Sequence, residues 1–318
     1  MSEIRVTGAG GQVGRCLVRF GSGGGVVGYD STEWDITDPT AAADLVRPGV
    51  TIINCAAYTA VDAAETDEDT ARRVNELGPD VLARACAAAG ARLIHLSTDY
   101  VFDGASGVVG ADGVAGAAAV PYEPDDPPAP RTAYGRTKWA GERAVLASGA
   151  RATIVRTAGL YTGIGTDFVA TMLRLERERE TVDVVTDQVT STTYAPDLAA
   201  ALLDLAARDV DAPILHMTNP GPVTWFDFAR EIFAGVGADP DRVRPTTAAR
   251  FARPAPRPAY SVLSDRSRAE AGLPPLRPRP EALAAALEAA SAARRGPGAA
   301  VGADAGTAGR GKPTAGTD

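Results

Sequence analysis

A glycine-rich turn near the N-terminus constrains the fold of this chain more than any other feature. The turn reads Thr7-Gly-Ala-Gly-Gly-Gln-Val-Gly14 and follows the β-prone run Ile4-Arg-Val6. Gly8 permits a tight turn, Gly11 lets a pyrophosphate approach the backbone, and Gly14 lets the helix and the strand pack closely. At the N-terminus of the following helix, unpaired N–H groups and the helix dipole favour an anion. The turn therefore predicts a dinucleotide-binding α/β fold.

The rest of the first half alternates short β-prone runs with alanine-rich stretches, which is the pattern of a parallel sheet with crossover helices. The predicted strands lie at about residues 3–7, 25–29, 51–54, 91–97 and 151–156. The predicted helices lie at about residues 12–20, 39–47, 67–89 and 134–148. We expect a Rossmann-like, doubly wound parallel sheet, with residues 1–156 as the dinucleotide-binding domain.

The second half is less regular. It is predicted to contain helices at 168–179, 196–207 and 224–234, and strands at 182–185 and 214–217. Residues 157–292 should form mainly a smaller α/β substrate-binding lobe, with the option that the chain returns to the main sheet. Residues 106–131 are rich in Gly, Ala, Pro and Asp and predict a long loop, typical of a lid or a site wall. Residues 293–318 lack the apolar side chains for a core and predict a disordered tail.

Composition excludes several classes of protein. The formal net charge of −8, from 40 acidic and 32 basic residues, argues against nucleic-acid binding through a basic surface. No run reaches the roughly 18 apolar residues that span a bilayer, and the N-terminus shows no signal-peptide core. Cys16, Cys55 and Cys86 lie in apolar contexts and are interpreted as buried thiols in a reducing compartment. We expect a cytoplasmic protein.

The chain has two histidines, His95 and His216, and each lies inside a predicted strand. With so few imidazoles, a histidine-based catalytic triad or a zinc site is disfavoured. Both histidines are predicted to be structural, so proton chemistry has to use other side chains.

Asp30 closes the second predicted strand, at the distance from the glycine turn expected for a ribose-binding carboxylate. Such a carboxylate accepts hydrogen bonds from the adenosine ribose and repels a 2′-phosphate. No Arg or Lys follows in Ser31-Thr-Glu33, which favours NADH over NADPH. The alternative is a solvated carboxylate at a strand end.

Tyr134 and Lys138 are four positions apart on a predicted helix and therefore lie on one face. A nearby ammonium favours the phenolate, so Lys138 is expected to lower the pKa of Tyr134 and fit it for proton exchange with an alcohol or ketone. Thr98 lies in Ser97-Thr-Asp99, at the carboxyl end of the fourth predicted strand, where ligands bind in open α/β sheets. The alternative is a surface Tyr and Lys on a solvated helix face.

Together these motifs resemble the extended short-chain dehydrogenase/reductase superfamily and, within it, the dTDP-4-dehydrorhamnose reductases, over about residues 3–290. The more specific strings are Asn54-Cys-Ala-Ala-Tyr-Thr-Ala-Val-Asp62, Ser97-Thr-Asp-Tyr-Val-Phe-Asp-Gly104, Tyr134-Gly-Arg-Thr-Lys-Trp-Ala-Gly-Glu142 and Thr166-Asp-Phe168. The resemblance implies a catalytic set of Thr98, Tyr134 and Lys138. The dinucleotide contacts it implies, with those expected from the glycine turn, are Gly8, Gly11, Gln12, Val13, Gly14, Asp30, Asp35, Ile36, Ala56, Ala57, Tyr58, Thr59, Tyr134 and Lys138. The substrate contacts it implies are Thr98, Asp99, Tyr100, Gly159, Asp167, Phe168, Arg253 and Arg257.

The proline-rich segment Arg253-Pro-Ala-Pro-Arg-Pro258 must be extended, because each proline fixes φ and disfavours helix at the residue before it. By the resemblance this segment would border the nucleotide end of the substrate, and its arginines suit bidentate pairing with phosphate. The alternative is a rigid connector with exposed arginines.

The reaction implied by the resemblance is reduction of the C4 keto group of a dTDP-4-keto-6-deoxy-L-hexose by NADH or NADPH. Tyr134 would donate the proton and Thr98 would orient the carbonyl. The product would be dTDP-L-rhamnose or a related 6-deoxysugar, and the protein would be a monomer or a homodimer.

The sequence departs from the family pattern at three places. Gly159 stands where the family carries a tryptophan near the sugar, so a wider sugar pocket is expected. Thr190-Ser-Thr-Thr193 replaces a stretch that contains proline. Cys16 stands where some members carry a metal-bridging glutamate, so no metal site is expected.

Three alternatives stay open. One is a reductase of a related dTDP-4-ketosugar in a secondary-metabolite pathway. Another is a sugar-nucleotide epimerase or dehydratase, although Tyr100-Val101 replaces the Asp-Glu pair of the dehydratases. The third is a non-enzymatic regulatory subunit resembling the β subunit of methionine adenosyltransferase, against which the complete set of Thr98, Tyr134 and Lys138 argues.

Overall fold

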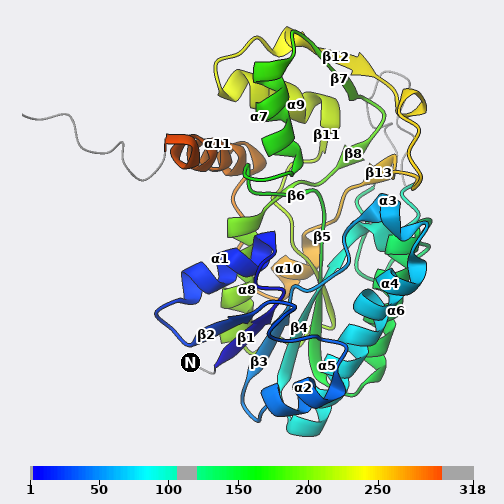
Figure 1. Cartoon of the computed structure of the whole chain (residues 1–318), viewed down its shortest axis with the longest axis vertical. Coiled ribbons are helices and arrows are strands. Elements are labelled where there is room, and N and C mark those ends of the chain that lie inside the picture. Colours follow the sequence, from blue (N-terminus) through cyan, green and yellow to red (C-terminus); the bar gives the residue numbers. More distant parts are fainter. Residues whose placement is uncertain (1–2, 106–119, 296–318) are drawn as a thin grey trace, which may run out of the picture.

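The computed structural model describes residues 3–105 and 120–295 of the chain. Most of the loop predicted at 106–131, and the predicted tail from residue 296, lie outside the described residues. Figure 1 shows a parallel sheet flanked by helices and, above it, a smaller group of helices and short strands.

The sheet has six strands, and every neighbouring pair is parallel. The strands, in spatial order, are β2 (Val26–Tyr29), β1 (Ile4–Thr7), β3 (Thr51–Asn54), β4 (Arg92–Thr98), β5 (Arg151–Thr157) and β10 (Ile214–His216). All four residues of β3 are buried, as expected for a strand covered on both faces. The prediction of a doubly wound parallel sheet is confirmed.

Alternate strand residues pack into two separate cores. Ile53 and Ile94 lie in the core formed with α1 (Gln12–Gly21) and α8 (Ala195–Ala207). Ile52 and Leu93 lie in the opposite core. Its helices are α2 (Pro39–Leu45), α5 (Gly78–Ala89) and α6 (Ala133–Ala147). The sheet is therefore sandwiched between two helical layers (Figure 1).

The winding direction reverses between β1 and β3. The chain leaves β1 toward β2 at one edge, then returns to place β3 on the other side of β1. In open α/β sheets, ligands bind in the crevice outside the carboxyl ends of the strands at such a switch point. The loops that follow β1 and β3 are therefore positioned to form a binding site.

The single helix predicted at 67–89 is wrong in detail. The structure has α4 (Glu68–Arg72), a π-helical turn at Arg73–Leu77, and then α5. Pro79 has no N–H with which to bond the carbonyl of Asn75, so the regular α-helical ladder cannot continue there. That carbonyl instead faces α6, where a Cβ added to Gly141 would lie 2.0 Å from it.

The smaller lobe has its own apolar core, which includes Phe228, Ile232 and Phe233. Its helices are α7 (Phe168–Glu178), α9 (Trp225–Gly235) and α11 (Arg279–Arg295). Its short strands are β7 (Val182–Val185), β8 (Val189–Thr190), β11 (Val223–Thr224), β12 (Val243–Thr246) and β13 (Tyr260–Ser261). Residues 293–295 belong to α11, so the predicted start of the tail at 293 is wrong.

The structure also has several further short elements. They are α3 (Val61–Ala64), β6 (Leu160–Tyr161), β9 (Thr193–Tyr194) and α10 (Arg266–Glu270). Between residues 195 and 216 the chain returns to the main sheet, where α8 packs on α1 and β10 extends the sheet beside β5. None of the helices in the described ranges has the length and apolar character needed to cross a bilayer.

Candidate active site

The glycine turn joins three segments at the switch point. Gly8 has a φ of +69°, and a Cβ added there would lie 2.6 Å from the backbone nitrogen of Ala56 after β3. A Cβ on Gly14 would lie 2.3 Å from the carbonyl oxygen of Gly8. Side chains at either position would therefore push α1, β1 and β3 apart, whereas a Cβ on Gly10 would have no atom of the described residues within 4 Å.

The N-terminus of α1 fits an anionic ligand. Gly11 is the N-cap and supplies no side-chain hydrogen bond, and the first turn carries no acidic residue. The N–H groups of this turn are therefore open to a ligand, and the helix dipole favours a negative charge there. A dinucleotide's diphosphate matches both properties, and Gln12 and Val13 begin the helix at that point.

Asp30 is exposed just beyond β2. One of its oxygens, Oδ1, accepts hydrogen bonds from the hydroxyl and the N–H of Thr32 at 2.6 and 2.8 Å, and these bonds lower the pKa of Asp30. Within residues 3–105 and 120–295, Oδ2 makes no hydrogen bond, so it remains available to a ribose hydroxyl.

The guanidinium of Arg73 lies beside Asp35, near the expected adenosine site. Oδ2 of Asp35 lies 3.8 Å from a guanidinium nitrogen of Arg73, which comes from the π-helical turn. Ile36 is buried against Gly78, so only its main chain can face a ligand. Sequence reasoning missed Arg73, because only the fold brings that turn to the end of β2.

Ala56, Ala57, Tyr58 and Thr59 follow β3 along the same crevice. The main chain of Tyr58 is held by the buried side chain of Asn75, which accepts from its N–H at 2.8 Å and donates to its carbonyl at 3.1 Å. Asn75 also donates to Thr137 on α6 at 3.1 Å. This asparagine was missed because its stretch resembles an ordinary helix in the sequence.

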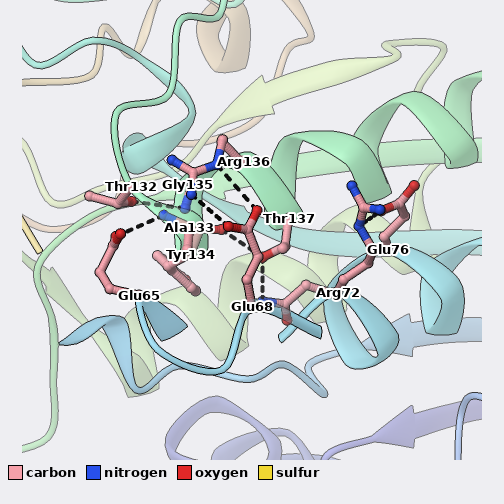
Figure 2. A network of polar contacts seen from close by, with 11 residues as sticks. Glu65, Glu68, Arg72, Glu76, Thr132, Ala133, Tyr134, Gly135, Arg136 and Thr137 are labelled. Atoms are coloured by element: carbon pink, nitrogen blue, oxygen red, sulfur yellow. Dashed lines mark hydrogen bonds and ion pairs between the residues drawn. The ribbon is translucent and has the colours of Figure 1, made fainter. Parts of the chain in front are cut away.

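Tyr134 lies in the first turn of α6, and several bonds fix that turn. Figure 2 shows Glu65 bonded to the N–H of Ala133 at 2.8 Å, and Glu68 paired with Arg136 at 2.7 Å. The hydroxyl of Thr132 caps the helix by accepting from Gly135 N at 3.0 Å. The start of α6 is thereby tied to the segment that follows β3.

Thr98 and Tyr134 meet between β4 and α6. A hydrogen bond from Thr98 lowers the pKa of Tyr134, but burial has the larger effect and raises it to about 12. The Tyr134 ring also packs edge-on against Tyr100, with 5.6 Å between the ring centroids. The phenol is half-buried and remains protonated at neutral pH.

The expectation that Lys138 lowers the pKa of Tyr134 is wrong, because the pKa of Tyr134 is raised and Lys138 is not among the groups that shift it. Lys138 is buried, and its Nζ donates to the carbonyl of Leu96 at 2.7 Å. Burial also lowers the pKa of Lys138 to about 8. The amine therefore lies beneath the site, beside β4, and burial of the phenol outweighs the hydrogen bond that favours its ionised form.

Lys138 also belongs to a buried polar chain that crosses the sheet. Asn54 accepts at Oδ1 from Thr7 Oγ1 at 2.6 Å and from Ala56 N at 3.0 Å, so its amide nitrogen faces Nδ1 of His95 at 3.0 Å. Nδ1 is thus an acceptor, and in neutral His95 the proton is on Nε2. Burial holds the pKa of His95 well below its usual value.

A cavity of about 800 Å³ opens beside Tyr100, between the sheet and the smaller lobe. Of the predicted substrate contacts, the structure brings Asp99, Tyr100, Gly159, Phe168, Arg253 and Arg257 to its wall. Asp99 is buried, and burial raises its pKa to about 6. Trp225 and Phe251 also line the cavity and were missed by sequence reasoning.

Asp167 has a different place from the one predicted. It does not line this cavity, and its carboxylate caps α7 by accepting from Ala170 N at 2.9 Å. The same carboxylate accepts from both the N–H and the hydroxyl of Thr162 at 2.8 Å, and from Gln12 at 3.2 Å. These bonds hold the turn before α7 and leave little capacity for a substrate contact.

Gly159 lines the cavity in a conformation that excludes a side chain. Its φ is +52°, and an added Cβ would lie 2.6 Å from the carbonyl oxygen of Ser191. The apolar wall comes instead from Phe168 and Trp225, whose ring centroids are 4.5 Å apart. An aromatic surface is therefore present, but it comes from α7 and α9.

The parallel sheet, the glycine turn at its switch point, and Tyr134 and Lys138 on α6 define a short-chain dehydrogenase/reductase. The model of the family described as the RmlD substrate binding domain matches residues 1–292. The chain therefore belongs to this family, that of the dTDP-4-dehydrorhamnose reductases.

Known proteins agree with this assignment. A dTDP-4-dehydrorhamnose reductase from Mycobacterium tuberculosis is 53% identical over 290 residues, which cover 90% of this chain and 93% of the relative. A dTDP-4-keto-6-deoxy-D-glucose reductase from Streptomyces niveus is 44% identical, covering 86% of this chain and 92% of the relative. The structure of a dTDP-4-dehydrorhamnose reductase from Bacillus anthracis in complex with NADP superposes with a TM-score of 0.80 at 34% identity, covering 89% of this chain and 97% of that chain.

Proposed function

We propose that this protein reduces the C4 keto group of a dTDP-4-dehydro-6-deoxy-L-hexose, converting dTDP-4-dehydrorhamnose to dTDP-L-rhamnose with NADH or NADPH. The observation that carries the proposal is the edge-on packing of Tyr134 against Tyr100, a residue of the cavity wall that follows Thr98 by two positions. The relatives that bear this activity in their names match nearly the whole chain.

The crevice at the switch point suits the nicotinamide cofactor. Its diphosphate would lie on the open N-terminus of α1, and Oδ2 of Asp30 would accept from the adenosine ribose. Lys138 would bind the nicotinamide ribose. When bound, the cofactor supplies the hydride that reduces the carbonyl carbon.

Tyr134 supplies the proton. With a pKa of about 12, its phenol is protonated at neutral pH and is therefore a donor for the alkoxide that forms on C4. The Thr98 hydroxyl hydrogen-bonds the same carbonyl oxygen and orients it toward the phenol. The proton passes from Tyr134 Oη to the sugar oxygen, and the phenolate is reprotonated from solvent before the next turnover.

The direct test is turnover with a small panel of dTDP-4-keto sugars. We expect stoichiometric loss of NADPH or NADH absorbance with dTDP-4-dehydrorhamnose, and NMR spectra of the product that match dTDP-L-rhamnose. Consumption of reduced cofactor in proportion to product also separates a reductase from an epimerase or a dehydratase. Absence of turnover with every sugar of the panel would overturn the proposal and favour a regulatory subunit.

A second candidate is a reductase for a related dTDP-4-ketosugar. Gly159 favours this candidate, because it lines the cavity without a side chain and the aromatic wall comes from Phe168 and Trp225 instead, which gives the sugar a differently shaped surface. The same panel distinguishes the two candidates, since the preferred sugar is the one with the highest kcat/KM.

A further inference from the structure

One carboxylate of the sheet domain holds the arginine-rich wall of the cavity. Asp62 lies in α3, and its Oδ2 accepts from a terminal nitrogen of Arg257 at 2.8 Å. The same oxygen lies 3.6 Å from a terminal nitrogen of Arg253. Its Oδ1 accepts from the N–H of Ala255 at 3.2 Å. A single side chain thus makes contact with three residues of one segment.

That segment has few other ways to be held. Pro254, Pro256 and Pro258 have no N–H, so the segment cannot form a regular strand ladder. The structure anchors its far end, because Tyr260 N donates to Gly104 O at 3.0 Å. Within the segment, the buried residue Ala255 supplies the N–H that reaches Asp62. The position of both arginines therefore depends on this carboxylate.

The bonds to Asp62 leave donors free at the cavity wall. A guanidinium has five N–H groups, and Arg257 uses its two terminal nitrogens for one bond each, to Asp62 and to Ala255 O. The side chain of Arg253 is 57% exposed beside it. Arg253 and Arg257 share the single carboxylate of Asp62, so these three side chains together carry a net positive charge, which favours an anionic ligand.

We propose that Asp62 is a positioning residue for the diphosphate of the substrate. It holds Arg257, and through the segment Arg253, in the orientation in which their remaining N–H groups meet the phosphate oxygens. Fixing the guanidinium in advance lowers the conformational entropy that binding would otherwise remove. The proposal rests on the proposed function, because the substrate there carries a dTDP group.

The opposite role makes the opposite prediction. If Asp62 only competed with phosphate for the arginines, its removal would free both cations and tighten the binding of dTDP. If it positions them, its removal weakens binding. The direction of the change therefore separates the two roles.

The test measures the Kd of dTDP by isothermal titration calorimetry on the full-length protein. We expect Asp62→Ala to raise that Kd roughly ten-fold or more, the loss of about one charge-assisted hydrogen bond. Asp62→Asn, which keeps the shape and one acceptor, should give a smaller loss. In turnover, KM for the sugar nucleotide should rise while kcat changes little. Asp80→Ala, which breaks a pair with Arg84 on α5, is the matched control and should leave the Kd unchanged.

A double-mutant cycle tests whether Asp62 acts through Arg257. In the Arg257→Ala background, Asp62→Ala should raise the Kd of dTDP by a smaller factor than in the wild type, because only its effect on Arg253 remains. Unchanged NADPH affinity and an unchanged thermal midpoint show that the variants are folded. If both Asp62 variants bind dTDP as tightly as the wild type or more tightly, the inference is wrong. It is also wrong if the fold-change in Kd of the double variant equals the product of the fold-changes of the two single variants. If the wild-type protein does not bind dTDP, the proposed function itself fails.

Discussion

The side chains of Lys138 and His95 meet beneath the candidate active site, with the Nζ of the lysine 3.5 Å from the Nε2 of the histidine. Because Asn54 fixes Nδ1 of His95 as an acceptor, Nε2 carries the proton and faces Nζ. An ammonium has no lone pair with which to accept a hydrogen bond from the Nε2–H group, whereas a neutral amine has one. The geometry and the burial of Lys138 therefore act together to favour the neutral amine.

The pH dependence of stability should reveal this lysine. Its pKa is about 8 in the folded protein and 10.5 for the free side chain, so between these values the unfolded state binds more protons. The stability contributed by Lys138 therefore rises with pH across this window. Relative to Lys138→Met, the wild-type protein should gain about 3 kcal/mol of unfolding free energy from pH 7 to pH 11. Urea unfolding of both proteins at the two pH values measures this, and an equal difference at both would contradict it.

The glycine turn provides a pair of substitutions that should behave differently. Gly8→Ala combines a φ of +69° with a Cβ 2.6 Å from the Ala56 backbone, so β1 and β3 have to separate at the switch point. We expect a loss of more than about 2 kcal/mol of unfolding free energy and weaker NADPH binding. Gly10→Ala serves as the control, because its Cβ would meet no atom within 4 Å in the part of the chain that the structure describes. Denaturant unfolding and NADPH titration compare the two, and similar stabilities would show that the close approach is unimportant.

Gly159 allows the same comparison in the sugar pocket. Gly159→Ala has a φ of +52° and a Cβ 2.6 Å from Ser191 O, whereas Gly149→Ala has a φ of +74° and open space around it. Both substitutions carry a backbone cost of about 1 kcal/mol, and only the first adds a clash. We expect Gly159→Ala to lose at least about 1 kcal/mol more in thermal or urea unfolding. Equal losses would mean that the Ser191 carbonyl moves away without cost.

The parallel sheet could be predicted from the sequence because its signals are local. β3 and β4 each contain a short β-prone pair, Ile52-Ile53 and Leu93-Ile94, and the glycine turn lies between a strand and a helix, so neither signal depends on distant contacts. The approach of the end of β4, with Thr98, to α6, with Tyr134 and Lys138, could be predicted for a similar reason. A strand end and a helix face determine their positions once the order of the strands is known.

Other features depend on tertiary contacts that no local pattern specifies. The π-helical turn follows from Pro79 together with the close approach of Gly141 on α6. The sequence predicts Asp167 as a substrate contact, but in the structure its carboxylate accepts hydrogen bonds from Thr162 and Ala170 at the start of α7. The pKa of Tyr134 depends on how deeply the ring is buried, and spacing along a helix does not give that depth.

In the proposed mechanism, Tyr134 gives its proton to the sugar oxygen. The most direct measurement is single-turnover reduction of dTDP-4-dehydrorhamnose by Tyr134→Phe, with the Kd values of NADPH and dTDP measured in parallel. We expect a rate lower by roughly 10²- to 10⁴-fold with both affinities nearly unchanged, because only a proton donor is removed. A rate within about ten-fold of the wild type, at unchanged affinities, would contradict it.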